Sequence, residues 1–246
     1  YLDTSGEALF KRGLRKAAGK ASLRENLAAG IIRLTGWQPG IPLLDPMCGS
    51  GTFLLEAALI TFNIPPGLNR RFAFEKFRHF NQTLWNRLKK TAISAQLPII
   101  PQPIFGSDLY GDALTDAIKN FTAAGLADAV TLKQANILEV SPPLSQGIVV
   151  TNPPYGNRIG EQQALMEFYP KLGDVLKKKF SSWHVFIISA DPAMPKLIRL
   201  RAARRTPLFN GALECRLFEY KMVSGEMRKN KSIDTVQQAA PLSYHK

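Results

Sequence analysis

The sequence predicts an α/β fold in which a mostly parallel sheet is covered by helices on both faces. Short apolar runs, suited to buried strands, alternate along the chain with longer segments of helical periodicity. Polar residues directly follow several of these runs, as they do where the strands of an open sheet end. Near the C-terminal end, Asn210 and Gly211 separate two β-like runs, which predicts an antiparallel hairpin.

The alternation can be followed element by element. Residues 1–37 are expected to be helical, with a well-defined helix over 22–34. The expected parallel strands are 41–45, 104–109, 130–136, 147–150 and 183–190, and the hairpin that follows them ends at 223. The expected helices are 52–61, 81–95, 113–124, 164–180 and 195–203. With the two strands of the hairpin, this pattern gives a seven-stranded sheet.

Composition divides the chain into regions. We expect a basic N-terminal extension over 1–37, a main domain over 38–227 and a polar tail over 228–246. Within the main domain, 63–102 is an insertion in which basic residues are interleaved with aromatic ones. The chain opens directly into patterned sequence at Tyr1, without an initiator methionine, so we expect it to be part of a longer polypeptide.

Charge and cysteine content limit the partners and the compartment. The 246 residues include 32 Lys and Arg against 19 Asp and Glu, and the net charge of +13 favours a polyanionic partner such as nucleic acid. A basic surface without a specific partner is the alternative. The apolar runs are too short to span a membrane, and there is no signal-peptide pattern. Cys48 and Cys215 lack metal-ligand spacing, so we expect a reducing, cytoplasmic setting and no metal site.

The segment after the first expected strand predicts a ligand site. The strand ends in Asp45, a loop with Gly49 and Gly51 follows, and then comes the helix 52–61, which is the opening of a nucleotide-binding α/β unit. The loop has neither the lysine that a triphosphate needs nor the G-x-G-x-x-G of a pyrophosphate site. A carboxylate here suits a cationic ligand, and S-adenosylmethionine carries a sulfonium and an ammonium group. Cys48 is expected to pack in the loop rather than to act as a nucleophile.

A second motif, Asn152-Pro153-Pro154-Tyr155, follows the fourth expected strand. The chain leaves the sheet there, because consecutive prolines donate no backbone hydrogen bonds. The carbonyl oxygens of Asn152 and Pro153 could accept both N–H bonds of a planar amino group and aim its lone pair at a methyl donor. Tyr155 would stack on the base and hold it out of its helix. The alternative is an ordinary Asn-Pro turn with a tyrosine at its rim.

Further polar and basic residues extend this interpretation. Asp108 ends the second expected strand, where an acid usually accepts hydrogen bonds from ribose hydroxyls. We expect contacts to nucleic-acid phosphates from the N-terminal extension and from the insertion, whose aromatic residues should mostly be core. The alternative is that these basic residues line solvated faces. The expected RNA-binding residues are Lys11, Arg12, Arg15, Arg70, Arg71 and Arg78.

The two motifs, over 45–53 and 152–155, resemble those of amino-methyltransferases that act on nucleobases. One longer feature resembles the segment before the catalytic domain of THUMP-containing RNA methyltransferases. Two others resemble the insertion and the post-motif region of the RlmL-type, UPF0020-like 23S rRNA guanine-N2 methyltransferases. The segments that carry these resemblances are 3–9 with 12–15, 65–70 with 72–75, and 151–159 continuing to 169 and 172–177.

The resemblance implies a class I, Rossmann-like methyltransferase fold and assigns roles to residues. Asp45, Gly49 and Gly51 would hold the methionine part of S-adenosylmethionine, and Asp108 would bind its ribose. Asn136 stands where the family usually has an aspartate that accepts a hydrogen bond from the adenine amine. An asparagine can accept the same bond, but without the charge the bond would be weaker. The implied donor-binding residues are Asp45, Pro46, Cys48, Gly49, Gly51, Thr52, Asp108, Leu109, Asn136, Ile137 and Asn152, and the implied catalytic residues are Asn152, Pro153 and Tyr155.

The activity implied by the resemblance is methylation of the N2 amine of a guanine in 23S rRNA, before the ribosome is fully assembled. The family usually has an upstream THUMP domain that helps to bind RNA, and residues 1–37 would be the linker to it. In some bacteria a second methyltransferase domain follows, and the tail after Arg228 would lead toward it. Two alternatives stay open: a DNA N6-adenine methyltransferase with the same motif, and a non-catalytic RNA-binding module, which the set of Asp45, Asp108 and Asn152 disfavours.

Overall fold

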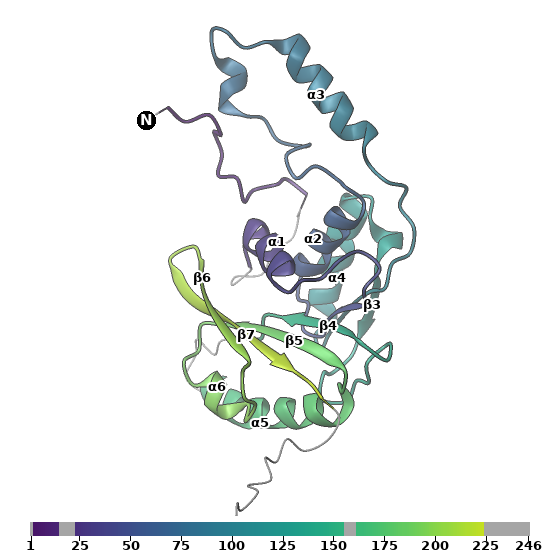
Figure 1. Cartoon of the computed structure of the whole chain (residues 1–246), viewed down its shortest axis with the longest axis vertical. Coiled ribbons are helices and arrows are strands. Elements are labelled where there is room, and N and C mark those ends of the chain that lie inside the picture. The colour runs from purple at the N-terminus through teal and green to yellow at the C-terminus, as the bar shows by residue number, and fades with distance from the viewer. Residues whose placement is uncertain (1, 15–22, 155–160, 224–246) are drawn as a thin grey trace, which may run out of the picture.

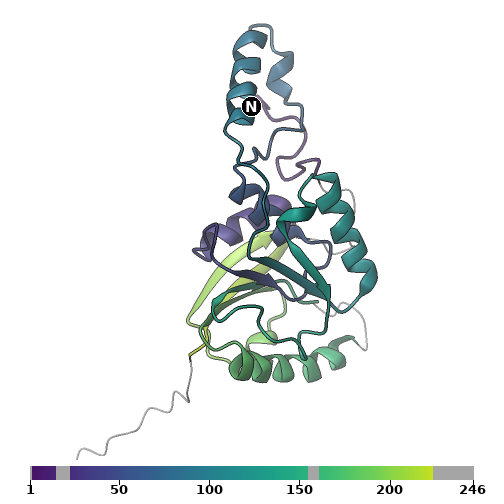
Figure 2. The ribbon, with the colours of Figure 1, turned by 90° about the vertical axis from the view of Figure 1, so that its right-hand side faces the viewer.

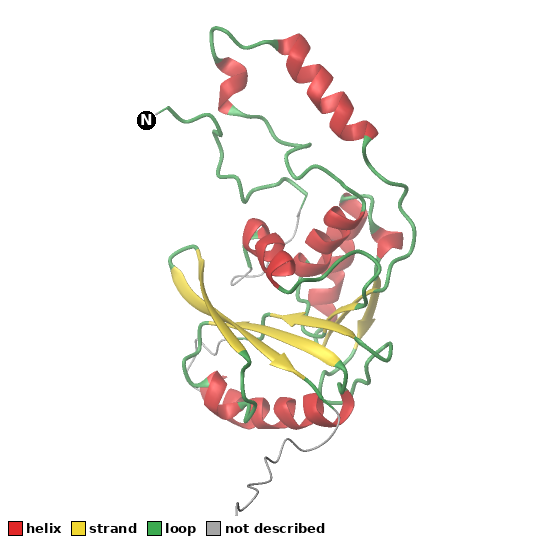
Figure 3. Cartoon of the chain, in the orientation of Figure 1, coloured by secondary structure: helices red, strands yellow, loops and turns green. Residues whose placement is uncertain are grey.

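The computed structural model describes residues 2–14, 23–154 and 161–223, and a seven-stranded sheet lies at its centre (Figures 1 and 3). The strand order is β3-β2-β1-β4-β5-β7-β6. The first five strands in this order are parallel to one another, and β7 runs antiparallel to both β5 and β6. This confirms the predicted sheet and its reversed hairpin. The strands are β1 (Leu43–Asp45), β2 (Ile104–Asp108), β3 (Thr131–Gln134), β4 (Gly147–Thr151), β5 (Trp183–Ser189), β6 (Arg204–Asn210) and β7 (Leu213–Lys221).

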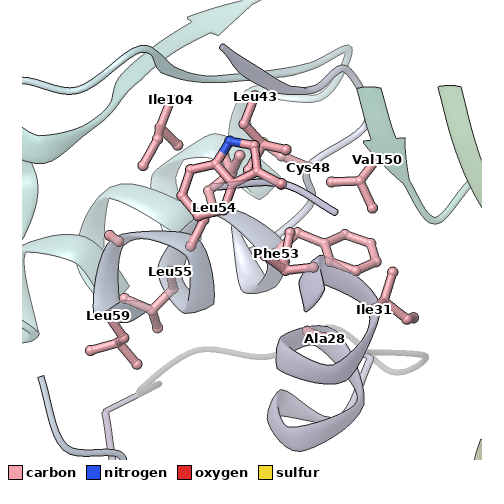
Figure 4. Packing of buried hydrophobic residues seen from close by; sticks show 14 of the residues in the cluster. Ala28, Ile31, Leu43, Cys48, Phe53, Leu54, Leu55, Leu59, Ile104 and Val150 are labelled. Atoms are coloured by element: carbon pink, nitrogen blue, oxygen red, sulfur yellow. The ribbon is translucent and has the colours of Figure 1, made fainter. Parts of the chain in front are cut away.

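Helices cover both faces of the sheet, as predicted. One face carries α1 (Glu25–Leu34), α2 (Thr52–Thr61) and α4 (Gly111–Ala123). Nine of the ten residues of α2 are buried, because the sheet, α1 and α4 enclose it. Figure 4 shows Phe53 and Leu55 of α2 in this cluster, between α1 and the strands. The tight packing explains why α2 is apolar on all sides rather than amphipathic.

The opposite face carries α5 (Glu161–Lys179) and the short α6 (Met194–Leu197). The buried side chains of Tyr169, Phe180 and Trp183 form the centre of this second cluster. No helix joins β3 to β4. Instead, Lys179 at the end of α5 donates hydrogen bonds to the carbonyl oxygens of residues 139 and 140 and so fixes that connection to the domain.

The insertion forms a lobe that stands apart from the sheet (Figure 2). It contains the 3-10 helix η1 (Ala73–Lys76) and α3 (Gln82–Ser94), and of the described residues of α3 none is buried. A second 3-10 helix, η2 (Ala127–Ala129), lies outside the lobe, between α4 and β3. The aromatic residues of the lobe pack on one another, with ring centroids 5.1 to 5.9 Å apart. They are therefore a local core and not part of the main one. The cluster consists of Phe72, Phe74, Phe80 and Trp85.

The N-terminal segment belongs to the same lobe. Arg70 donates hydrogen bonds to the backbone carbonyl oxygens of residues 5, 7 and 8, and the Phe74 N–H donates one to Thr4 at 3.1 Å. The expectation that residues 1–37 are helical was wrong for the described residues 2–14, which form turns. Gly6 and Gly13 have φ values of 76° and 75°, and such left-handed residues interrupt a helix. The expected helix over 22–34 is present as α1.

Most expected elements agree with the structure to within a few residues, and α6 and the hairpin turn differ for reasons that the structure shows. The helix expected over 195–203 ends after one turn of α6, because Arg199 has a left-handed φ of 55°. The carbonyl oxygen of Ile198 lies so close to Gly173 of α5 that a Cβ there would stand 1.9 Å from it, which fixes the end of α6 against α5. The hairpin turn consists of Gly211 and Ala212 rather than Asn210 and Gly211, since Asn210 still pairs with Leu213. The polar tail 228–246 lies outside the described residues.

Candidate active site

Three polar side chains gather where the central strands of the sheet end. Asp45 is the last residue of β1, Asp108 is the last residue of β2, and Asn152 directly follows β4. Because β1 pairs in parallel with both β2 and β4, these ends lie side by side at one edge of the sheet. In open α/β sheets, ligands bind at this edge. The structure thus brings together the three residues on which the sequence interpretation depends.

Asp45 is a buried carboxylate that is only 2% exposed. Its Oδ1 accepts hydrogen bonds from the Thr151 hydroxyl at 2.9 Å and from the Met47 backbone N–H at 3.2 Å. Burial raises the pKa of Asp45 to about 7, although these two hydrogen bonds oppose the shift. Among the described residues, no basic side chain contributes to the pKa of Asp45. A carboxylate buried in this way is suited to a cationic ligand.

Asp108 holds the loop that follows β1. Its Oδ2 accepts a hydrogen bond from the Gly49 backbone N–H at 2.9 Å, and its Oδ1 accepts one from the Tyr110 N–H at 3.0 Å. Each oxygen retains a lone pair for a further donor. The expected binding of ribose hydroxyls by Asp108 therefore stays a prediction, to which the structure adds a role in positioning the loop.

The loop depends on glycine at two positions. Gly49 and Gly51 have φ values of 53° and 79°, in the left-handed region that favours glycine. A Cβ on Gly51 would lie 2.9 Å from the ring of Phe121 in α4, closer than carbon atoms can approach. Directly before Phe121, the Asn120 side-chain amide donates a hydrogen bond to the Ser50 carbonyl oxygen at 3.0 Å. Helix α4 therefore supports the loop with both an apolar and a polar contact.

Replacing Gly51 with alanine should lower the free energy of unfolding by about 2–4 kcal/mol, since the change adds a steric clash to an unfavourable φ. Gly125→Ala is the matched control, because Gly125 has a φ of 68° but a Cβ added there would meet no atom within 4 Å. The control should lose only about 1–2 kcal/mol. Urea unfolding measures both values. Equal losses in the two variants would mean that the contact with Phe121 relaxes freely.

Three other residues expected at the donor site, Pro46, Cys48 and Thr52, belong to this loop or directly adjoin it. Cys48 is buried, and burial together with the nearby Asp45 and Asp108 carboxylates raises the pKa of its thiol. A protonated, buried thiol packs and does not attack, which agrees with the packing role expected for Cys48. The Pro46 carbonyl oxygen accepts a hydrogen bond from the Ser107 hydroxyl at 3.4 Å, and Thr52 is buried in the first turn of α2.

The other expected donor contacts follow β2 and β3. Leu109 is 52% exposed directly after Asp108, and Ile137 is buried in the second hydrophobic cluster, on the α5 face of the sheet. Asn136 accepts a hydrogen bond from the Leu138 N–H at 3.0 Å through Oδ1, and its Nδ2 donates one to Glu139 at 3.4 Å. Asn136 thus caps a local turn, and a single lone pair of its Oδ1 stays available for an amine.

The Asn-Pro-Pro motif is held from both sides. Before it, the Thr151 hydroxyl contacts Asp45, and after it the buried Tyr169 hydroxyl donates a hydrogen bond to the Pro154 carbonyl oxygen at 3.3 Å. Asn152 is half-buried and Pro153 is buried. Thr151 and Tyr169 were not predicted as site residues, because only the fold shows what their hydroxyls contact. Tyr155 lies outside the described residues, so its expected stacking role stays a prediction.

Two of the six expected RNA-binding residues make contacts within the protein. Arg12 lies 3.1 Å from Glu56 of α2 in an ion pair, and the two side chains are only 12% and 2% exposed. Arg70 donates hydrogen bonds to backbone carbonyl oxygens of the N-terminal segment. Its guanidinium also lies over the Phe72 ring, 4.9 Å from the ring centroid. The expected RNA contacts of both residues stay predictions, and each guanidinium would have to give up these contacts to reach a phosphate.

The remaining basic residues have other positions. Lys11 is exposed and lies 3.5 Å from Glu7 in a surface ion pair, which RNA could displace at little cost. Arg71 and Arg78 are exposed on the lobe. Arg15 lies outside the described residues. Within the part of the chain that the structure describes, no helix is long and apolar enough to cross a membrane, and no three His, Cys, Asp or Glu residues are grouped to hold a metal ion.

This strand order, with a glycine loop after β1 and an Asn-Pro-Pro turn after β4, defines a class I methyltransferase fold. Residues 12–219 match the UPF0020 family, described as the RMKL-like methyltransferase domain. The chain belongs to this family.

Individual relatives agree with the family. The chain is 40% identical to the protein slr0064 of Synechocystis sp., named an RNA methyltransferase, over 90% of this chain and 58% of the relative. It is 39% identical to the ribosomal RNA large subunit methyltransferase K/L of Aeromonas hydrophila, over 94% of this chain and 35% of that protein. The structure of SMU.472, described as a methyltransferase complexed with SAH, superposes with a TM-score of 0.82 at 36% identity, covering 91% of this chain and 58% of the other. The chain therefore spans about a third to three fifths of these relatives.

Proposed function

We propose that this domain transfers a methyl group from S-adenosylmethionine to the exocyclic N2 amine of a guanine in 23S rRNA. The observation that carries the proposal is the hydrogen bond from the Thr151 hydroxyl to Asp45, because Asn152 is the next residue of the chain. The buried Asp45 carboxylate suits a cationic donor, and the Asn152 amide, which follows Thr151, suits an amine. S-adenosylmethionine, when bound, supplies an electrophilic methyl group.

The residues present fit the donor. The Asp45 carboxylate is buried without a basic partner among the described residues, and the sulfonium and ammonium groups of the donor are cationic. Gly49 and Gly51 let the backbone approach a ligand closely. The relative SMU.472 is described as complexed with SAH, which supports the same class of ligand for this chain. Asp108, Leu109 and Asn136 are the further candidates for holding it.

The chemistry on the target side follows from the motif. An exocyclic amine of a nucleobase is a poor nucleophile, because its lone pair is delocalised into the ring. We infer that the carbonyl oxygens of Asn152 and Pro153 accept its two N–H bonds, orient the lone pair and stabilise the positive charge that develops on nitrogen. The Tyr169 contact on Pro154 would hold the turn rigid while the base enters. Tyr155 would stack on the base.

Ribosomal RNA as substrate is supported by two findings. The net charge of +13 favours a polyanion, and a relative that is 39% identical is named a ribosomal RNA large subunit methyltransferase. The lobe formed by the insertion and the N-terminal segment presents exposed Lys11, Arg71 and Arg78, which we expect to contact RNA phosphates. Residues 1–37 would then also connect to an upstream RNA-binding domain.

The runner-up is a DNA N6-adenine methyltransferase, because the Asn-Pro-Pro-Tyr motif would serve an adenine amine equally well. Incubation with labelled S-adenosylmethionine and equal amounts of rRNA and DNA separates the two. We expect the label in RNA, whereas N6-methyladenine in DNA with unlabelled RNA would overturn the proposal. A non-catalytic RNA-binding module is the third candidate, and the absence of any donor binding by calorimetry would support it.

RNA affinity should fall steeply as salt increases, because each phosphate contact displaces bound counterions. With several contacts, we expect the affinity to fall by about 10²-fold or more between 50 and 200 mM salt. Fluorescence anisotropy with an rRNA fragment measures the slope. Donor binding in the same buffers serves as the control and should change little. A flat response of the RNA affinity would contradict binding through the basic surface.

A further inference from the structure

A cavity of about 380 Å³ opens next to the proposed active site, between the carboxyl end of β5, helix α6 and the β6–β7 ribbon. In Figure 1, α6 lies beside α5, below β6 and β7. The walls include Ser189, Asp191, Lys196, Arg205 and Arg216. None of them has a role in the donor site, so the cavity is a separate feature of the same edge.

The register of the sheet places this cavity beside the Asn-Pro-Pro motif. Thr151, the last residue of β4, pairs with Ile187 of β5, so the motif begins beside the end of β5, two residues before Ser189. The Tyr169 hydroxyl makes a second link, because it donates to the Pro154 carbonyl oxygen and is also hydrogen-bonded to Ser189. The Tyr169 hydroxyl therefore connects the motif to Ser189 in the wall of the cavity.

Three basic side chains line the cavity against the carboxylates of Asp191 and Glu214, so the lining has a small net positive charge. The Asp191 carboxylate accepts a hydrogen bond from the Ala193 N–H at 2.7 Å, and Arg216 lies 3.4 Å from Glu214 in an ion pair. Lys196 and Arg205 form no ion pair with any residue that the structure describes. Both side chains are exposed toward solvent, on α6 and on β6.

Packing positions Arg205 toward the cavity. Its guanidinium lies 6.0 Å from the centre of the Phe218 ring, a residue of β7 that also lines the cavity. It is near enough to the buried Tyr220 hydroxyl to oppose the rise in the pKa of that group, which burial raises to about 12. An arginine supported on an aromatic face loses less side-chain freedom when it binds an anion. Arg205 is therefore better prepared for a fixed contact than a solvated surface lysine.

We propose that this cavity binds the phosphodiester next to the target nucleotide, through Arg205 and Lys196. The proposal rests on the function proposed above and adds the site that holds the RNA backbone. A base leaves its helix only when the backbone beside it is rotated, and an anchored phosphate keeps the rotated form in place. A cationic cavity one strand away from Asn152 is placed for such an anchor. Arginine suits it, because its planar fork can bind two phosphate oxygens.

The first test compares charge-neutral variants. Arg205→Gln and Lys196→Gln should each raise the KM for an rRNA fragment about tenfold and lower the slope of log affinity against log salt by about one. Donor affinity and the melting temperature should not change. Lys171→Gln is the matched control, because Lys171 is exposed on α5 and its replacement removes the same charge outside the cavity. Equal effects in the control and the cavity variants would overturn the proposal, since net charge alone would then explain them.

The second test uses the wild-type protein and does not depend on a stable variant. Short RNA substrates carry a single neutral methylphosphonate at each phosphate around the methylated guanosine in turn. One position should raise the KM about tenfold in the wild type and have no further effect in Arg205→Gln. Additive losses at every position would overturn the proposed anchor while leaving the proposed function intact. If the wild type methylates no RNA at all, the proposed function fails as well.

Discussion

Asn152→Ala is expected to reduce the rate of methyl transfer to RNA by about 10²–10³-fold, because it removes one of the carbonyl groups that orient the amine and stabilise its developing charge. Donor affinity should stay nearly unchanged, since the Asp45 contact with Thr151 does not involve the Asn152 side chain. Single-turnover kinetics with saturating RNA measure the chemical step, and calorimetry measures donor binding. The two measurements together separate a catalytic role from a structural one.

Asn86→Ala is a suitable control for this variant, because Asn86 is exposed on α3 and its side chain hydrogen-bonds locally, to Gln82. It should leave both the transfer rate and the donor affinity unchanged. If Asn152→Ala lowers donor affinity as much as it lowers transfer, Asn152 holds the fold of the site rather than the substrate, and the assignment of its role is wrong.

Asp45→Asn should have opposite effects on binding and on stability. Loss of the carboxylate removes the charge that attracts the cationic donor, so we expect the donor affinity to fall by about 10²-fold. The asparagine can still accept hydrogen bonds from the Thr151 hydroxyl and the Met47 N–H, which preserves the local structure. Asp174→Asn, an exposed change on α5, removes the same charge and should alter neither property.

The sign of the stability change follows from the pKa of Asp45. Burial raises it from the ordinary 3.8 to about 7, so the folded protein favours the neutral acid and loses stability as the pH rises through that interval. At pH 8 the neutral asparagine should therefore raise the free energy of unfolding of the ligand-free protein by about 2 kcal/mol. At pH 5 the gain should be smaller. Urea unfolding at both pH values tests this, and a destabilised Asp45→Asn at pH 8 would mean that burial does not penalise the carboxylate.

The wild-type donor affinity should follow the same titration. Below about pH 7, Asp45 binds a proton in the ligand-free protein, and the donor must displace it before the charges can pair. Calorimetry between pH 5.5 and 8.5 should therefore show affinity increasing with pH, while Asp45→Asn should show a flat profile. A wild-type affinity that does not depend on pH would mean that Asp45 is not the group facing the cation.

Local patterns were sufficient to predict most of the fold. The expected helix over 52–61 matches α2, because the left-handed Gly51 fixes where it starts and the apolar run fixes what it buries. The strand ends at Asp45 and Asp108 were correct because a polar residue directly follows each apolar run. The helix expected over 195–203 was too long, because its end depends on the contact between Ile198 and Gly173, which no pattern within the helix encodes.

The site was predictable only as far as its residues adjoin recognisable motifs. Thr151 and Tyr169 support the motif through hydroxyl contacts with Asp45 and Pro154, and only the tertiary structure reveals these. The basic residues show the same limit. Arg12 and Lys11 have the same charge in the sequence, yet Arg12 is paired with Glu56 and mostly enclosed, whereas Lys11 is exposed. Charge patterns predict a basic chain, whereas packing decides which charges a polyanion can reach.

Methylation of a guanine amine in RNA can be measured directly. Labelled methyl is transferred from S-adenosylmethionine to unmodified 23S rRNA, which is then digested to nucleosides for mass analysis. We expect N2-methylguanosine as the labelled product, and no label with Asn152→Ala at matched times. Label in any other nucleoside, or in DNA but not RNA under the same conditions, would contradict the function proposed for this site.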